Sequence, residues 1–159
     1  MDETTKLRCI SAKEECEKHI FRIQTALKRL NSLFPLTEES LKNLCDEDMA
    51  VLDQFLYRFT KLQDCLGLRL IPTLYLLLEP ETIARPFIDI LNRLEKLNVL
   101  TSAEDWQYFR SLRNNLAHEY PERTADIIYA INSLHTSWKR FSRLYNQLID
   151  TAEKTIQKL

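Results

Sequence analysis

EDMAVLDQFLYRFTKLQDCLGLRLIPTLYLLL, residues 47–78, carries the clearest helical pattern of the chain. Its apolar positions recur every three or four residues, which is the period of a helix that buries one face. The stripe consists of Leu52, Phe55, Phe59, Leu62, Leu66, Leu70, Thr73 and Leu77. Gly67 and Pro72 interrupt this helix, and because proline lacks a backbone donor and clashes with the preceding turn, we expect a kink near residues 68–70.

The same periodicity predicts further helices on both sides of this stretch. They cover residues 3–34, ended by Pro35, residues 87–97, residues 102–119 and residues 123–159. An acidic connection, residues 36–46, joins the first two helices and contains one helical turn that Thr37 caps. Ser102 and Asp105 resemble a capping box, and Pro121 is expected to end that helix near Glu119.

Composition agrees with this helical pattern. The 159 residues include one glycine and five prolines, fewer glycines than sheet turns and bulges usually require. Long helices with brief connections are typical of helical bundles. We therefore expect an all-α fold, an antiparallel four-helix-type bundle of about five helices, that forms a single domain over residues 1–159.

Charge and cysteine usage limit the classes of function. With 22 basic and 23 acidic residues the formal net charge is -1, so no global positive field attracts nucleic acid. Lys139, Arg140 and Arg143 form a compact basic cluster, interpreted as a solvated face or as a contact for RNA or a partner. Cys16 and His19 could be metal ligands, but no second ligand pair follows, and no metal site or cofactor is expected.

The chain has the features of a reduced cytoplasmic protein. The four cysteines, Cys9, Cys16, Cys45 and Cys65, include no C-x-x-C pair and suit small apolar core positions. Neither a signal peptide nor an apolar run long enough to span a bilayer is evident. The expected location is the cytoplasm, without membrane association.

Polar side chains gather in residues 110–121, RSLRNNLAHEYP, where the apolar stripe should continue. On a helix Arg110, Asn114 and His118 share one face, with Arg113 on the neighbouring row. Arginine binds phosphodiesters and histidine titrates near neutral pH, which suits RNA cleavage by the adjacent 2′-hydroxyl. Such cleavage needs a base and an acid, and a two-fold dimer would supply the second histidine.

Structural interpretations of the same residues remain open. His118 near a helix C-terminus is also a favourable partner for the helix dipole, and Arg113 could pair with Glu119 or Asp105. Asn114 could be a solvated helix residue. The other two histidines, His19 and His135, are expected to be structural or solvent-facing. Trp106 and Trp138 fit core positions better than base stacking.

Residues 113–120 resemble the R-x4-H-x-Y motif of HepT-like HEPN proteins: Arg113-Asn-Asn-Leu-Ala-His118-Glu-Tyr120. A second stretch, residues 58–67, RFTKLQDCLG, also resembles that family. The resemblance implies an all-α dimer in which Arg113 and His118 are the catalytic pair and Asn114 is the accompanying polar residue. It also implies that a partner nucleotidyltransferase can modify Tyr120 with AMP.

The resemblance implies a metal-independent endoribonuclease toxin of a type II or type VII toxin-antitoxin system. Its partners would be RNA, a second copy of the chain and a cognate minimal nucleotidyltransferase antitoxin that neutralises it. An alternative is a noncatalytic HEPN companion that assists a nucleotidyltransferase. A third interpretation, a helical adaptor without RNA, draws support from the near-neutral net charge.

Overall fold

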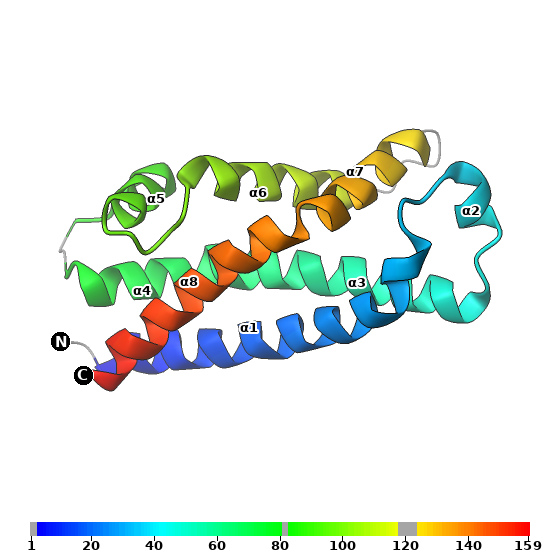
Figure 1. Cartoon of the computed structure of the whole chain (residues 1–159). Coiled ribbons are helices and arrows are strands. Elements are labelled where there is room, and N and C mark those ends of the chain that lie inside the picture. Colours follow the sequence, from blue (N-terminus) through cyan, green and yellow to red (C-terminus); the bar gives the residue numbers. More distant parts are fainter. Residues whose placement is uncertain (1–2, 81–82, 118–123) are drawn as a thin grey trace.

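The computed structural model describes residues 3–80, 83–117 and 124–159, and within these residues it contains helices and no strand (Figure 1). The helices are α1 (Glu3–Leu30), α2 (Glu38–Lys42), α3 (Asp46–Cys65), α4 (Ile71–Leu78), α5 (Phe87–Lys96), α6 (Ala103–Ala117), α7 (Thr124–Thr136) and α8 (Trp138–Gln157). The expected all-α class is confirmed. None of the described helices combines the length and the apolar composition needed to cross a membrane.

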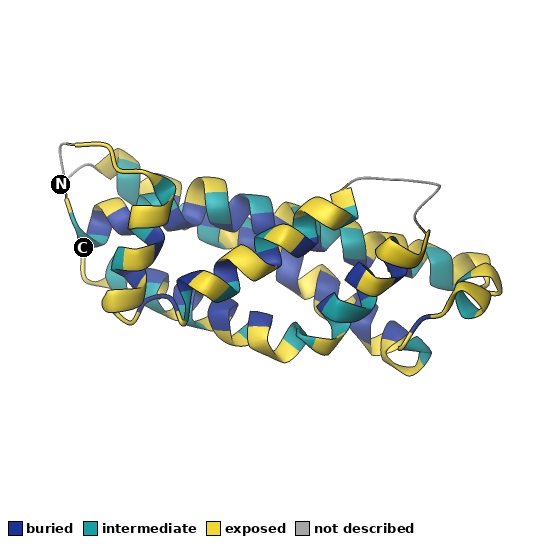
Figure 2. Ribbon diagram, turned by 90° about the horizontal axis from the view of Figure 1, so that it is seen from above, coloured by how far each residue is buried: buried dark blue, intermediate teal, exposed yellow. Residues whose placement is uncertain are grey.

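The long helices pack side by side as a helical bundle. α1 lies along α3 over most of its length, α6 packs on α3, and α8 runs diagonally back toward the start of α1 (Figure 1). Buried residues face inward on each long helix (Figure 2). This arrangement places α6, which carries Arg110, Arg113 and Asn114 of the predicted site, against α3.

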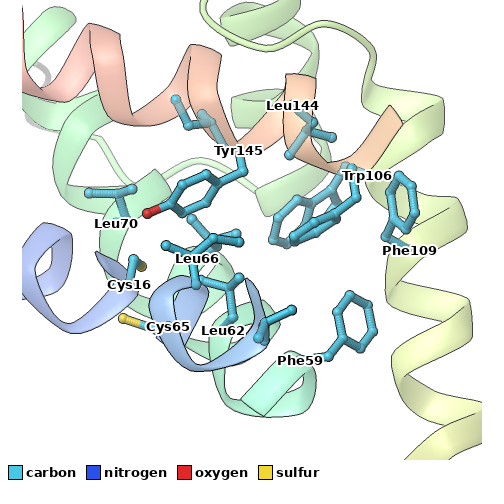
Figure 3. Packing of buried hydrophobic residues seen from close by; sticks show 14 of the residues in the cluster. Cys16, Phe59, Leu62, Cys65, Leu66, Leu70, Trp106, Phe109, Leu144 and Tyr145 are labelled. Carbon is cyan, nitrogen blue, oxygen red and sulfur yellow. The ribbon is translucent and has the colours of Figure 1, made fainter. Parts of the chain in front are cut away.

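The predicted stripe of residues 47–78 lies in the core. Of its eight members all are buried except Thr73, which is partly buried. Phe59 packs edge to face on Phe141 of α8, at a ring-centroid distance of 5.4 Å, and Phe109 of α6 does the same at 5.0 Å. Figure 3 shows Phe59, Trp106, Phe109 and Tyr145 around this core. Burial of each such ring contributes on the order of 2 kcal/mol.

The interruption expected from Gly67 and Pro72 is a π-helical turn, Leu66–Leu70, between α3 and α4. Because Pro72 has no N–H to donate to the carbonyl of Leu68, the regular helical pattern cannot continue there. Gly67 also meets Trp106 of α6: a Cβ at this position would lie 3.0 Å from Trp106 Cζ2. The lack of a side chain at Gly67 therefore lets Trp106 of α6 approach this turn closely.

The last predicted helix, residues 123–159, is wrong as a single helix. α7 ends at Thr136 and α8 begins at Trp138, and the Ser137 hydroxyl donates to the Ser133 carbonyl at 2.6 Å. A serine hydroxyl that bonds the backbone in this way competes with regular helical bonding. With this break, the π-helical turn and the short α2, the described residues form more helical segments than the five expected.

Two helix starts follow the predicted caps, and one helix end differs. Thr37 and Ser40 form a reciprocal capping box at α2, and Ser102 Oγ accepts a bond from the Asp105 N–H at 3.1 Å. The Asp105 carboxylate contacts Arg140 Nε at 3.3 Å instead of returning to the cap. The first helix gives way to a 3-10 turn at Asn31–Leu33, before the residue expected to end it.

Candidate functional site

Two arginines of α6 meet one carboxylate of α3. Arg113 donates from Nε to Asp64 Oδ1 at 3.1 Å and from Nη2 to Oδ2 at 2.8 Å. Arg110 donates from Nη1 to the same Oδ1 at 3.0 Å. A two-bonded arginine and carboxylate pair fixes the plane of the guanidinium as well as its position. We call these three side chains the Asp64 clamp.

The clamp keeps Asp64 ionised. Burial acts to raise the pKa of Asp64, but the hydrogen bonds and charges of Arg113 and Arg110 together outweigh burial and lower it below its usual value. One negative charge then faces two positive charges, so the clamp carries an excess of positive charge. Such a local excess attracts an anion even though the whole chain is slightly acidic.

The Arg113 guanidinium keeps hydrogen-bonding capacity. Two of its five N–H donors point to Asp64, and within the described residues it makes no other hydrogen bond. Its side chain is 23% exposed, so the remaining donors lie near the surface. The arrangement suits binding of a phosphate by an arginine whose orientation is already fixed.

The structure brings Arg113 together with Arg110 and does not bring Asn114 to them. Asn114 is exposed on α6, while Arg110, expected on the same face as Asn114, is turned toward Asp64. His118 and Tyr120 lie outside the described residues. His118 directly follows Ala117, the last residue of α6.

Asp64 is a site residue that the sequence interpretation missed. It is 49 positions away from Arg113. Asp105, which we considered as a partner of Arg113, pairs with Arg140 instead, so that expectation is wrong. Glu119, the other partner considered, lies outside the described residues. A signal was present, since Asp64 belongs to the RFTKLQDCLG stretch that shares the family resemblance.

The two described histidines have structural surroundings. His19 is buried, its Nδ1 lies 3.2 Å from Arg58 Nη1, and burial, followed by the charges of Arg58 and Lys61, lowers its pKa. His135 stacks on Phe34 at a centroid distance of 3.9 Å, and burial lowers its pKa as well. Both fit the structural role expected of them, which leaves His118 as the histidine open to chemistry.

The expected core roles of the aromatic and cysteine residues hold in part. Trp106 is buried and Trp138 partly buried, both packed among core rings. Cys9, Cys16 and Cys65 are buried, whereas Cys45 is exposed at the start of α3, where its Sγ caps the Asp48 N–H. Within the described ranges no three His, Cys, Asp or Glu side chains gather closely enough to hold a metal ion.

Comparison of the chain with models of known protein families, with curated proteins and with solved structures finds no match.

Proposed function

We propose that this chain is a metal-independent endoribonuclease of the HepT-like HEPN class. In this proposal it adopts the antiparallel four-helix-type bundle of that class as a homodimer in the cytoplasm. It would be the toxin of a type II or type VII toxin-antitoxin system. The observation that carries the proposal is the Asp64 clamp, which holds Arg113 in a fixed orientation five residues before His118.

The proposed chemistry assigns one task to each residue. Arg113 binds the scissile phosphodiester through the donors that Asp64 leaves free, and it stabilises the charge that develops there. His118 moves the proton of the 2′-hydroxyl or of the leaving 5′-oxygen. Asn114, exposed one residue after Arg113, contacts the substrate or orients His118.

A second copy of the chain completes the site. A single motif supplies one histidine, while the reaction needs both a base and an acid. In a two-fold dimer the same surface meets itself, so two motifs can face one cleft. The two histidines would then share the tasks of acid and base.

The cognate nucleotidyltransferase would control this site by attaching AMP to Tyr120. Tyr120 is two residues after His118 in the chain. A bulky group with a negative phosphate at this position would obstruct RNA and repel its phosphates. Modification would therefore silence the nuclease.

One observation favours the noncatalytic companion as the second candidate. The Asp64 clamp ties α6 to α3, and a partly exposed ion-pair network of this kind stabilises a fold by itself. A companion protein would keep the clamp for stability alone. The two candidates differ in whether the chain itself cleaves RNA, and the nuclease predicts that loss of His118 abolishes this cleavage.

Induction of the chain in bacterial cells separates these candidates. Wild type, His118→Ala and the control Asn115→Ala would be compared for growth and RNA integrity, since Asn115 is exposed near the end of the same helix. Growth arrest with RNA cleavage in wild type and Asn115→Ala, abolished in His118→Ala, supports the nuclease. Healthy growth with intact RNA in all three favours the companion, and arrest that persists in His118→Ala contradicts the assignment of His118.

A further inference from the structure

A basic hollow opens where α6, α7 and α8 meet, away from the Asp64 clamp. It has a volume of about 530 Å³, within the range of pockets that hold small ligands. Lys139, Arg140 and Arg143 of α8 line it together with Tyr108 of α6 and Tyr129 of α7. No acidic residue is among the described residues that line it, although acidic residues outnumber basic ones in the chain.

Two of these cations have no partner among the described residues. Within the described part of the chain neither Lys139 nor Arg143 takes part in an ion pair or a side-chain hydrogen bond, and both are exposed. Two contacts hold Arg140 in place: its Nε lies 3.3 Å from the Asp105 carboxylate, and its guanidinium lies over the Tyr108 ring, 4.4 Å from the centroid. One fixed and two free cations therefore face the hollow.

The placement of these cations is unfavourable for α8 alone. Lys139 and Arg143 are four positions apart, a spacing at which like charges repel each other on a helix. A bound anion would relieve this repulsion.

The rest of the hollow suits the other parts of a nucleotide. Tyr129 lines the hollow and is 75% exposed, and an exposed aromatic ring is a group on which a base can stack. The hydroxyls of Ser133 and Thr136 line the hollow, and within the described residues they make no side-chain hydrogen bond. They could bond ribose or phosphate oxygens.

We propose that this hollow binds a nucleotide unit, with its phosphate on Lys139, Arg140 and Arg143 and its base on Tyr129. The unit belongs either to a free nucleotide or to a single strand of nucleic acid. The proposal is independent of the proposed cleavage reaction, because Arg113 and Asp64 do not line the hollow. It also gives a ligand to the basic cluster of Lys139, Arg140 and Arg143, which the net charge of the chain does not account for.

Calorimetric titration of the full chain with three probes tests the proposal: inorganic phosphate, AMP and a short 2′-O-methyl oligoadenylate. The 2′-O-methyl group prevents attack by the 2′-oxygen, so binding is measured without cleavage. The variant Lys139→Gln/Arg143→Gln removes the two free cations. Its control, Lys18→Gln/Arg22→Gln, removes the same charge from exposed positions of α1.

The hollow variant is expected to bind AMP and the oligonucleotide about tenfold or more weakly, because two charge-assisted contacts with the phosphate are lost. The control should change affinity by less than about twofold. Similar affinity for AMP and the oligonucleotide would identify a free nucleotide, and much tighter binding of the oligonucleotide a strand. The proposal would be overturned if both double variants lost the same amount of affinity for AMP and the oligonucleotide. It would also be overturned if no probe bound the wild-type chain at millimolar concentration.

Tyr129→Ala tests the stacking part. We expect weaker binding of AMP and the oligonucleotide, by about fivefold or more, with unchanged binding of inorganic phosphate. Tyr57→Ala is the control, since Tyr57 is also exposed, at 56%, but lies on α3. Unchanged AMP affinity in Tyr129→Ala would exclude the base from this hollow.

Discussion

At the scale of single residues, Asp64 has the largest influence on the candidate site. Its carboxylate orients Arg113 through two hydrogen bonds and also binds Arg110. Without that carboxylate the two guanidinium groups would repel each other, and Arg113 would sample several rotamers. The position of the proposed phosphate ligand thus depends on a residue that is not expected to touch RNA.

Asp64→Asn is expected to lower the free energy of unfolding by about 1–2 kcal/mol, because a partly buried, charge-assisted pair is lost. It should also slow RNA cleavage about 10- to 100-fold, since Arg113 is no longer held in place. Urea denaturation and a cleavage assay measure the two effects. Asp53→Asn, an exposed aspartate of the same helix, serves as control, and equal cleavage by both variants would argue against the clamp as a positioning device.

The two described histidines predict how stability depends on pH. The folded chain lowers the pKa of both His19 and His135, whereas an unfolded chain has histidine pKa values near 6.5. Below about pH 6.5 the unfolded state therefore binds protons first. Each histidine then removes up to about 1.4 kcal/mol of stability per pH unit as the pH falls toward its folded pKa.

His135→Phe isolates one of these contributions. The new ring can still stack on Phe34 but does not titrate, so stability should fall less steeply than in wild type between about pH 7 and pH 5. Urea denaturation at several pH values measures the slope. Identical slopes in the two proteins would mean that His135 does not take part.

At the scale of helices, α6 packs closely on the π-helical turn at Leu66–Leu70. Gly67 lies in that turn, directly against Trp106 of α6. Trp106 is almost fully buried and packs edge to face on Phe87 of α5, at a ring-centroid distance of 6.0 Å. Any shift of Trp106 would also shift α6 and its arginines.

Gly67→Val should therefore destabilise the chain by about 1–3 kcal/mol, because the new side chain would meet the Trp106 ring, its Cβ lying 3.0 Å from Trp106 Cζ2. Chemical denaturation followed by tryptophan fluorescence measures the loss. Ala50→Val, at an exposed position of α3, shows the cost of valine in a helix without a clash, about 0.5 kcal/mol. If Gly67→Val were no less stable than this control, the inferred contact would be wrong.

Helix positions could be predicted from the sequence where a local signal exists. The period of apolar residues located α1, α3, α5 and α6, and Thr37 and Ser102 marked two helix starts. The break at Ser137 has no such signal, because the buried stripe continues through it from Leu134 to Phe141.

For the candidate site, the periodicity placed the polar residues on one helix, but it could not show which residue of another helix they contact. Asp64 and Arg113 are distant in the sequence, and nothing local in either helix specifies the other. Packing of α6 on α3 creates the pair. The sequence therefore pointed to Arg113, whose role as a phosphate ligand is a proposal, and missed Asp64, the residue that orients it.

At the scale of the whole molecule, positive charge is local while the net charge is -1. The Asp64 clamp and the basic hollow lie at different places on the bundle, and the chain lacks a general positive surface charge. Affinity for nucleic acid should thus come from a few defined contacts. The proposed dimer would double each of them.

The proposed shared active site predicts interference by an inactive chain. When excess His118→Ala is co-folded with wild type, hybrid dimers would contain one His118, and activity per wild-type chain should fall several-fold. Light scattering should give a mass about twice the 18.9 kDa of the chain. Unchanged activity per wild-type chain would show that one copy holds a complete site.

Cleavage of a labelled RNA by the purified chain in the presence of a metal chelator is the most direct test of the proposed activity. Attack by the 2′-hydroxyl predicts products with 2′,3′-cyclic phosphate and 5′-hydroxyl ends, with no cleavage by His118→Ala and none of a fully 2′-O-methylated RNA. An RNA that stays intact with the wild-type chain, or one that is cut equally by His118→Ala, would contradict the account.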